Sequence, residues 1–165
     1  MAKITLHGNE INTNGDLPAV GSTAPGFSLV DKNLNNVGLK EFPGKKKLLN
    51  IVPSLDTGVC ATSTKRFDAE APKHTDTVFM IISSDLPFAQ ARFCGAEHTA
   101  NVVTLSLMRD RRFAKDYGVL ITDGALAGIT ARAVVVLDAN DKVLYTEMVP
   151  EIGQEPDYDK ALAAL

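Results

Sequence analysis

The sequence predicts an α/β fold in which a central mixed sheet is flanked by helices and preceded by an N-terminal β-hairpin. Two observations support this. Apolar, strand-like runs alternate with helical patterns in the middle of the chain, which is typical of parallel strands joined by helices. Two further strand-like runs near the C-terminus are joined by a short polar turn, which adds an antiparallel pair. The 165 residues fit one domain, 1–165, which can fold without a disulfide or a metal.

Short strands are expected in the first part of the chain. Runs of strand-like composition occupy Lys3–Leu6, Glu10–Thr13, Phe27–Val30 and Asn36–Leu39. The tripeptide His7-Gly8-Asn9 between the first two runs suits a hairpin turn. A stretch rich in glycine and proline, residues 15–26, separates this hairpin from the third run.

The middle of the chain alternates between strands and helices. Three buried strands are predicted over Lys47–Val52, Val78–Ser83 and Val102–Leu107. Helices are predicted over Cys60–Glu70, Phe88–Cys94 and Arg111–Tyr117. Pro87 suits the start of the second helix, and Gly95 is expected to stop it.

The C-terminal part is expected to be a hairpin followed by a helix. The runs Ala131–Leu137 and Lys142–Met148 flank the turn Asp138–Asp141, and Pro156 precedes a helix over Asp157–Leu165. A thioredoxin-like α/β domain is the natural candidate for this order of elements.

Charge and hydropathy exclude several functions. A net charge of −3 argues against a nucleic-acid surface, which needs a basic stripe to displace the counterions of phosphate groups. The run Lys45-Lys46-Lys47 is interpreted as a solvated edge before a strand. Apolar runs such as Val78–Ile82 are far shorter than the roughly 20 residues of a membrane span. Because Met1–Glu10 has no apolar segment typical of a signal peptide, a cytoplasmic protein is expected.

The surroundings of Cys60 favour redox chemistry. In a reducing compartment two cysteines are either small buried residues or redox groups, rather than a structural disulfide. Cys60 lies in the first turn of a predicted helix, where free N–H groups and the helix dipole favour its thiolate, the nucleophilic form. Thr57 lies on the same loop, and its hydroxyl can accept a hydrogen bond from a peroxide O–H or donate one to an oxygen. Pro53 lacks an N–H and can shield the thiolate from water.

A peroxide reaction also needs a cation beside the thiolate and the leaving oxygen. Arg132 is our candidate, because it opens the predicted strand Ala131–Leu137, where an inward-pointing arginine is hard to explain as core. The alternative is an exposed charge at the strand edge, and the sequence leaves both interpretations open.

These residues resemble the active-site motif of the peroxiredoxins. The spacing Pro53-x-x-x-Thr57-x-x-Cys60 matches the motif at every fixed position. Residues 53–63, 83–97 and 131–135 are similar to the bacterial thiol peroxidase subgroup, of the atypical two-cysteine type, and the resemblance covers essentially the whole chain. His98 stands where this resemblance leads us to expect a glycine-like residue.

The resemblance implies an antioxidant peroxidase with a defined catalytic cycle. Cys60 would be the peroxidatic cysteine and Cys94 the resolving one, and Pro53, Thr57 and Arg132 would complete the peroxide site. Substrates would be hydrogen peroxide and alkyl or lipid hydroperoxides, the reductant thioredoxin, and the assembly a homodimer. No cofactor is expected. A zinc site at Cys94 and His98 is disfavoured, because Gly95 interrupts their helix and no further ligands are near in sequence.

The disulfide implied for Cys60 and Cys94 predicts a conformational change. Each cysteine lies on a different predicted helix, whereas a disulfide needs Cα atoms within about 7 Å of each other. We therefore expect the Cys94 helix, or the first turn at Cys60, to unwind during turnover. Two other functions stay open on the residues alone. They are a thiol–disulfide oxidoreductase, which usually carries Cys-x-x-Cys, and a binding domain with two buried thiols.

Overall fold

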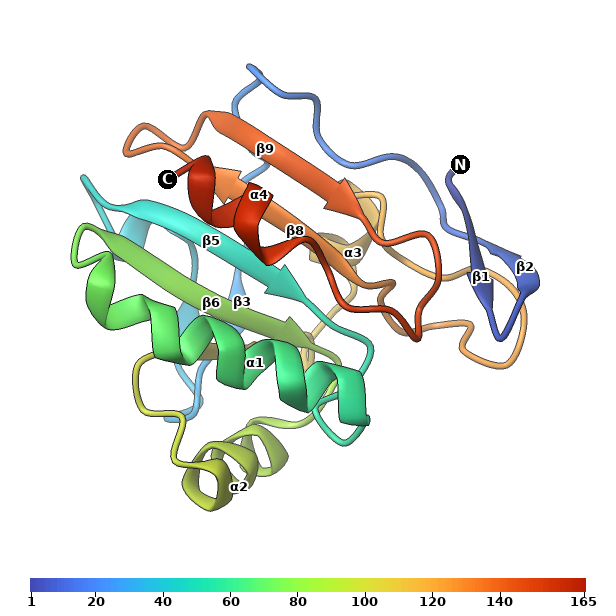
Figure 1. The fold of residues 1–165 in the computed structure, drawn as a ribbon, viewed down its shortest axis with the longest axis horizontal. Coiled ribbons are helices and arrows are strands. Elements are labelled where there is room, and N and C mark those ends of the chain that lie inside the picture. The colour runs from blue at the N-terminus through green and yellow to red at the C-terminus, as the bar shows by residue number, and fades with distance from the viewer.

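The computed structural model describes residues 1–165 and confirms the predicted fold class. Seven strands form one mixed sheet in the order β4-β3-β7-β6-β5-β8-β9, and β1 and β2 form a separate N-terminal hairpin. Figure 1 shows α1 and α4 in front of the sheet, α3 behind it and α2 at the periphery. No helix has the length and apolarity needed to cross a membrane.

The elements follow the predicted order with small changes at their ends. The strands are β1 Lys3–Leu6, β2 Asn9–Asn12, β3 Leu29–Val30, β4 Asn36–Val37, β5 Lys46–Ile51, β6 Thr77–Ser83, β7 Val103–Ser106, β8 Ala133–Leu137 and β9 Val143–Met148. The α-helices are α1 Gly58–Glu70, α2 Pro87–Glu97, α3 Arg112–Asp116 and α4 Tyr158–Ala163. Two short 3-10 turns, η1 Leu39–Glu41 and η2 Ala71–Lys73, complete the set.

Strands β5, β6 and β7 run parallel, whereas β8 pairs antiparallel with β5. The carboxyl ends of the three parallel strands therefore meet at one edge of the sheet, where α/β proteins usually build their sites. The antiparallel register joins Ile51, the last residue of β5, to Ala133, the first residue of β8. The segments just after β5 and just before β8 thus lie side by side at this edge.

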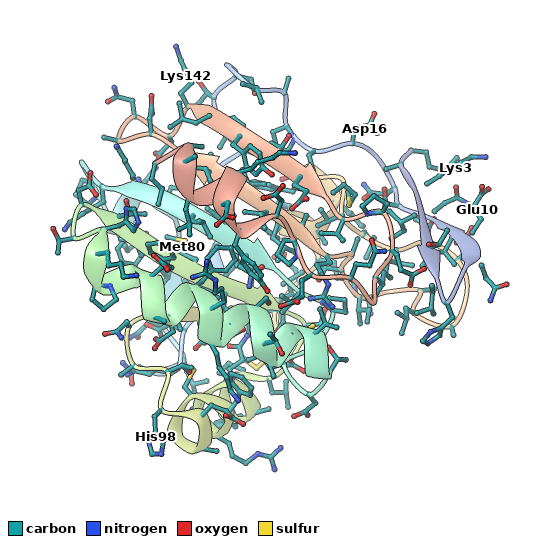
Figure 2. All side chains as sticks on the ribbon, in the orientation of Figure 1. Lys3, Glu10, Asp16, Met80, His98 and Lys142 are labelled. Atoms are coloured by element: carbon teal, nitrogen blue, oxygen red, sulfur yellow. The ribbon has the colours of Figure 1, made fainter.

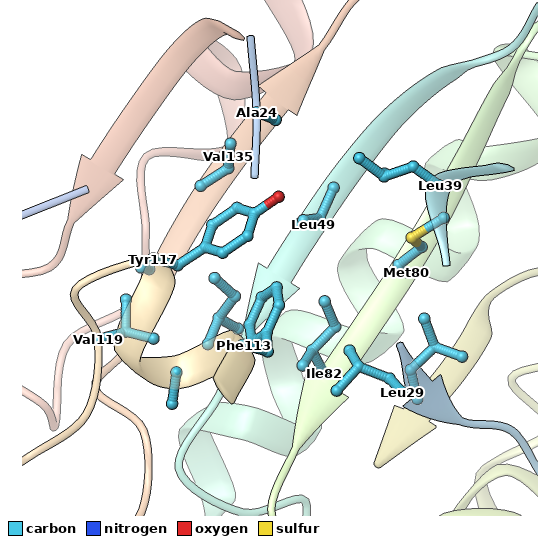
Figure 3. Packing of buried hydrophobic residues seen from close by; sticks show 14 of the residues in the cluster. Ala24, Leu29, Leu39, Leu49, Met80, Ile82, Phe113, Tyr117, Val119 and Val135 are labelled. Carbon is cyan, nitrogen blue, oxygen red and sulfur yellow. The ribbon is translucent and has the colours of Figure 1, made fainter. Parts of the chain in front are cut away.

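Alternate residues of the central strands fill the two faces of the sheet. On one face, Leu48 packs with Phe67 of α1 and Ala161 of α4. On the other, Leu49 belongs to the larger cluster that contains Phe113 of α3 and Tyr117, the residue after this helix, and Figure 3 shows these side chains interdigitating. The continuous apolar runs within β6 and β8 follow from this two-sided burial.

The N-terminal hairpin closes through a turn one residue shorter than the tripeptide that we predicted. His7 and Gly8 both have positive φ, 51° and 81°, and β2 begins at Asn9. Positive φ at both central residues defines the type I′ turn, whose twist matches that of the two strands. Figure 2 shows Lys3 and Glu10 of this hairpin projecting from the body of the protein.

Helix α2 begins at Pro87, as predicted, but the prediction that Gly95 stops it is wrong. The helix continues to Glu97 and ends at His98, whose φ of 56° is left-handed. The amides of His98 and Thr99 both donate to the carbonyl of Cys94, which closes the last turn. A left-handed residue after a helix is usually glycine, so this conformation explains why a glycine-like residue was expected at position 98. Figure 2 places His98 at the outer end of α2.

The interpretation of the lysine run as a solvated edge is wrong for Lys47. Its side chain is buried, with a relative exposure of 1%, and its Nζ lies 2.5 Å from a carboxylate oxygen of Asp141. Asp141 lies in the turn between β8 and β9, and Lys47 pairs with Leu137 at the end of β8. The turn therefore reaches Lys47 and supplies the countercharge that a buried ammonium group needs.

Candidate active site

Cys60 lies at the start of α1, as the sequence predicts. The loop after β5 leads into this helix, and the first intrahelical hydrogen bond runs from the amide of Ala61 to the carbonyl of Thr57, at 3.0 Å. The amides of residues 58–60 precede this bond, so they lie at the positive end of the helix dipole. Negative charge on the Cys60 sulfur is therefore favoured by the backbone itself.

The Cys60 side chain is fully buried, with a relative exposure of 0%. It packs with Val52, Leu55 and Ile81, and Phe93 of α2 packs against the same cluster. An ionised group among apolar side chains is strongly disfavoured unless a countercharge or hydrogen-bond donors accompany it. A thiolate at Cys60 thus needs a partner that reaches into the core.

Arg132 is that partner. One terminal nitrogen of its guanidinium lies 3.3 Å from the Cys60 sulfur, although the two residues are 72 positions apart. Its side chain is 1% exposed, so the alternative of an exposed strand-edge charge is wrong. Its Nε donates to the carbonyl of Ile152, at 2.9 Å, which fixes the plane of the guanidinium.

The charge of Arg132 is not neutralised by a carboxylate. The nine ion pairs of the chain involve other residues, and the nearest acceptors are the Cys60 sulfur and the carbonyl of Ile152. A buried cation without a countercharge costs several kcal/mol. A Cys60 thiolate removes this cost, so the thiolate and the guanidinium stabilise each other.

Thr57 and Pro53 lie at the two ends of the loop before α1. Thr57 is the N-cap residue and is exposed, and its hydroxyl donates to the carbonyl of Ser54 at 3.0 Å instead of capping the helix. The hydroxyl proton is thus engaged, while its oxygen remains able to accept a hydrogen bond. Pro53 is buried beside the end of β5. The loop therefore has an exposed polar end at Thr57 and a buried apolar end at Pro53.

Glu151 links the N-terminal hairpin to the segment that holds Arg132, and sequence reasoning did not identify it. Its carboxylate accepts hydrogen bonds from the Thr5 hydroxyl at 2.5 Å and from the amides of His7 and Gly8 at 3.0 and 3.1 Å. The next residue, Ile152, supplies the carbonyl that orients Arg132. The only sequence signal is an acidic residue next to Pro150, which is too common to be informative.

We expect the Glu151 anchor to make the stability of the protein depend on pH. The donor side chain of Thr5 and the turn amides lower the pKa of this carboxyl from 4.5 to about 2. A carboxyl whose pKa is depressed on folding contributes stability above about pH 4.5, and this contribution is lost as the pH falls through 2. The difference in thermal midpoint between the wild type and Glu151→Gln should thus shrink from pH 6 towards about pH 2. The matched control is Glu10→Gln, on the same hairpin. A difference in thermal midpoint between the wild type and Glu151→Gln that stays constant with pH would contradict this prediction.

Cys94 lies in the last turns of α2 as a half-buried free thiol, and Cys60 is free as well. Cys94 lines a hollow of about 640 Å³, which Lys32 and Thr99 also line. Burial raises the pKa of the Cys94 thiol, with the Thr99 hydroxyl opposing the shift. In this folded arrangement Cys94 is therefore a neutral thiol and a weak nucleophile.

Comparisons with known proteins identify the family of the chain. The Redoxin family profile matches residues 19–162. Curated thiol peroxidases of Mycobacterium tuberculosis and Mycobacterium bovis are each 58% identical to the chain over 165 residues, covering 100% of it and 99% of their own length.

Solved structures give the same assignment. A peroxiredoxin-like protein from Aquifex aeolicus is 38% identical, with a TM-score of 0.90 over 100% of this chain and 98% of its own. A thiol peroxidase from Chromobacterium violaceum is 27% identical, with a TM-score of 0.91 over 98% of this chain and 93% of its own. With the buried Cys60 at the start of α1 and Arg132 beside it, the chain belongs to the redoxin family, as a peroxiredoxin of the thiol peroxidase subgroup.

Proposed function

We propose that this peroxidase reduces hydrogen peroxide and alkyl or lipid hydroperoxides at Cys60, in antioxidant defence. The observation that carries the proposal is the 3.3 Å contact between the buried Cys60 sulfur and the guanidinium of Arg132, at the positive end of α1. The contact supplies both requirements of the reaction, a thiolate nucleophile and a cation for the departing oxygen.

In the first step the Cys60 thiolate attacks the nearer oxygen of the peroxide. An S–O bond forms, the O–O bond breaks, and the electron pair leaves with the distal oxygen as alkoxide or hydroxide, which takes up a proton. Cys60 becomes a sulfenic acid and is oxidised by two electrons, while the peroxide is reduced to an alcohol or water. Arg132 stabilises the departing oxygen, the Thr57 oxygen accepts the peroxide O–H, and Pro53 keeps bulk water away.

In the second step Cys94 resolves the sulfenic acid. Its sulfur displaces the hydroxyl group from the Cys60 sulfur, so that an intrachain disulfide forms and one water molecule leaves. We propose that thioredoxin then exchanges its dithiol with this disulfide, which returns Cys60 and Cys94 as thiols. We also propose a homodimer, for which Leu86 and Phe88, apolar and exposed by 51% and 63%, provide a contact surface.

We propose that Cys94 reaches the sulfenic acid through local unwinding, either of its own helix α2 or of the first turn at Cys60. Only Pro87 and Gln90 of this helix are fully buried, so its C-terminal half is held by few interior contacts. Unwinding there would bring the Cys94 sulfur towards Cys60. It would also remove the burial that raises the pKa of the Cys94 thiol, and hence increase its reactivity.

We expect this unwinding to be visible in hydrogen exchange. In the disulfide form, the amides of residues 87–95 should exchange at least about tenfold faster than in the reduced protein, most strongly around Cys94. Residues 63–70 of α1, on the far side of Cys60 from the loop, serve as the internal reference. Equal protection of residues 87–95 in the two redox states would show that the disulfide forms without unwinding of this helix.

A thiol count tests the proposed function. Reduced protein is mixed with one equivalent of cumene hydroperoxide, and free thiols and cumyl alcohol are measured. The proposal requires the loss of both thiols within seconds and one alcohol per protein chain. Survival of both thiols in a large excess of hydroperoxide would refute it. Protein thiols consumed by a disulfide reagent but not by hydroperoxide would instead indicate a thiol–disulfide oxidoreductase.

A further inference from the structure

Asp85 lies in the turn between β6 and α2 and holds the active-site loop through its carboxylate. Oδ1 accepts a hydrogen bond from the Ser54 hydroxyl at 2.8 Å. Oδ2 accepts one from the amide of Leu55 and one from the Ser83 hydroxyl, both at 2.8 Å. Three donors thus converge on one carboxylate, and two of them belong to the loop between Pro53 and Thr57.

The sheet and α2 fix Asp85 from the other side. Ser83 and Ser106 are paired in register at the ends of β6 and β7. The Ser106 hydroxyl donates to the backbone carbonyl of Asp85 at 2.5 Å. The buried Gln90 amide group donates to the Ser83 hydroxyl at 3.1 Å and to the carbonyl of Leu105 at 2.9 Å. Asp85 is therefore a rigid point from which the loop is held.

The hydrogen bonds continue from Asp85 to the residue that meets the peroxide. Ser54, which Asp85 holds by its hydroxyl, accepts hydrogen bonds at its carbonyl from the Thr57 hydroxyl at 3.0 Å and from the Thr57 amide at 3.2 Å. The orientation of the Thr57 oxygen is thereby set by the position of Ser54. Leu55, held by its amide, packs against Cys60. One carboxylate thus influences both sides of the space in which a peroxide must bind.

We propose that Asp85 is a positioning residue of the peroxide site, acting through Ser54 and Leu55 on Thr57 and Cys60. This inference rests on the proposed function, since it needs a peroxide to bind at Cys60. Asp85 acts on the geometry of approach and not on the charge of the thiolate, which Arg132 and the helix dipole stabilise. A misplacement of about 1 Å in a reacting group can lower a rate about 100-fold.

The test compares two electrophiles in a Cys94→Ser background, where Cys60 is the single thiol. Hydroperoxide needs the orientation of Thr57, whereas iodoacetamide needs only a thiolate that it can reach. For Asp85→Ala we expect the rate constant with hydroperoxide to fall about 100-fold, and the rate constant with iodoacetamide to stay within about twofold. Asp85→Asn keeps one acceptor oxygen, so its rate constant with hydroperoxide should lie between those of Asp85→Ala and the parent. This second variant preserves the test if the alanine variant does not fold.

Asp56→Asn is the matched control, because it removes one negative charge from an exposed side chain of the same loop. It should leave both rate constants within about twofold of the parent. Hydroperoxide reactivity in the two Asp85 variants equal to that of the control would overturn the proposal. Parallel losses with both electrophiles would also overturn it, because Asp85 would then support the thiolate and not the peroxide geometry. If Cys60→Ser still consumed hydroperoxide, the proposed function would fail independently of Asp85.

Discussion

An Arg132→Met variant is expected to react with hydroperoxide at least about 1,000-fold more slowly than the wild type. Loss of a single preorganised donor to a developing oxyanion lowers rates about 10²- to 10³-fold. Arg132 has a second role, because its guanidinium is the cation beside the buried Cys60 sulfur, at 3.3 Å. Both contributions are removed together, so the combined loss should be at the upper end of this range or beyond it.

The measurement is a stopped-flow rate constant for the first turnover, with reduced protein and cumene hydroperoxide under pseudo-first-order conditions. Methionine is unbranched and apolar, so it fills most of the space of the arginine stem without introducing a charge. Because removing one partner of a buried pair is destabilising, and because the Ile152 carbonyl loses its donor, the thermal midpoint of the reduced variant should fall. A midpoint of the variant well above the assay temperature would separate the kinetic loss from misfolding.

Arg66→Met is the matched control for this variant. Arg66 lies on α1, as Cys60 does, but its side chain is 40% exposed and pairs with Glu70 on the helix surface. Exposed pairs of this kind contribute about 0.3–0.5 kcal/mol, so the control should keep the wild-type rate constant within about twofold. A rate constant of Arg132→Met within tenfold of the wild type would show that Cys60 does not depend on this cation.

The second large effect is expected from the two cysteines, which should fail at different steps. Cys60→Ser should show no protein-dependent consumption of hydroperoxide, since a serine hydroxyl at neutral pH is a far weaker nucleophile than a thiolate. Cys94→Ser should keep the first turnover and release one equivalent of alcohol. Its steady-state turnover with thioredoxin should fall at least about 100-fold, because no disulfide is available for exchange.

Mass spectrometry distinguishes the two variants directly. Cys94→Ser treated with one equivalent of hydroperoxide should carry a sulfenic acid on Cys60, which dimedone traps as a stable adduct. Cys60→Ser under the same conditions should carry no adduct. A Cys94→Ser enzyme that turns over at the wild-type rate with thioredoxin would show that Cys94 does not resolve the sulfenic acid. In that case the reductant would act on the sulfenic acid itself.

The order of the elements and the chemistry that we propose for Cys60 can be predicted from the sequence, because both arise from local patterns. The pattern of apolar residues predicts β5 and α1. The position of Cys60 in the first turn of α1 places it at the positive end of the helix dipole. Helix ends are local as well, yet they depend on the backbone angles of single residues. The stop expected at Gly95 fell at His98 for that reason.

Side chains that act across the sheet could not be assigned in this way. Both an inward and an outward Arg132 suit the start of β8, and only the antiparallel register of β5 and β8 directs it towards Cys60. The prediction of a solvated Lys47 is wrong for the same reason, because its partner Asp141 comes from the distant β8–β9 turn. From the sequence alone a lysine run is expected to be solvated, because only the fold brings a countercharge next to a lysine that is buried.

The sequence by itself determined the fold class, the peroxiredoxin resemblance and the cysteine that we propose as the nucleophile, because strand–helix order and the Pro53–Cys60 motif are encoded within short segments. Only the tertiary structure decided that Arg132 reaches the sulfur, that Glu151 anchors the hairpin, and that Asp85 holds the loop. These contacts join residues 30 to 146 positions apart. Their geometry depends on how the sheet brings its edges together, and hydrogen bonds depend steeply on distance and angle.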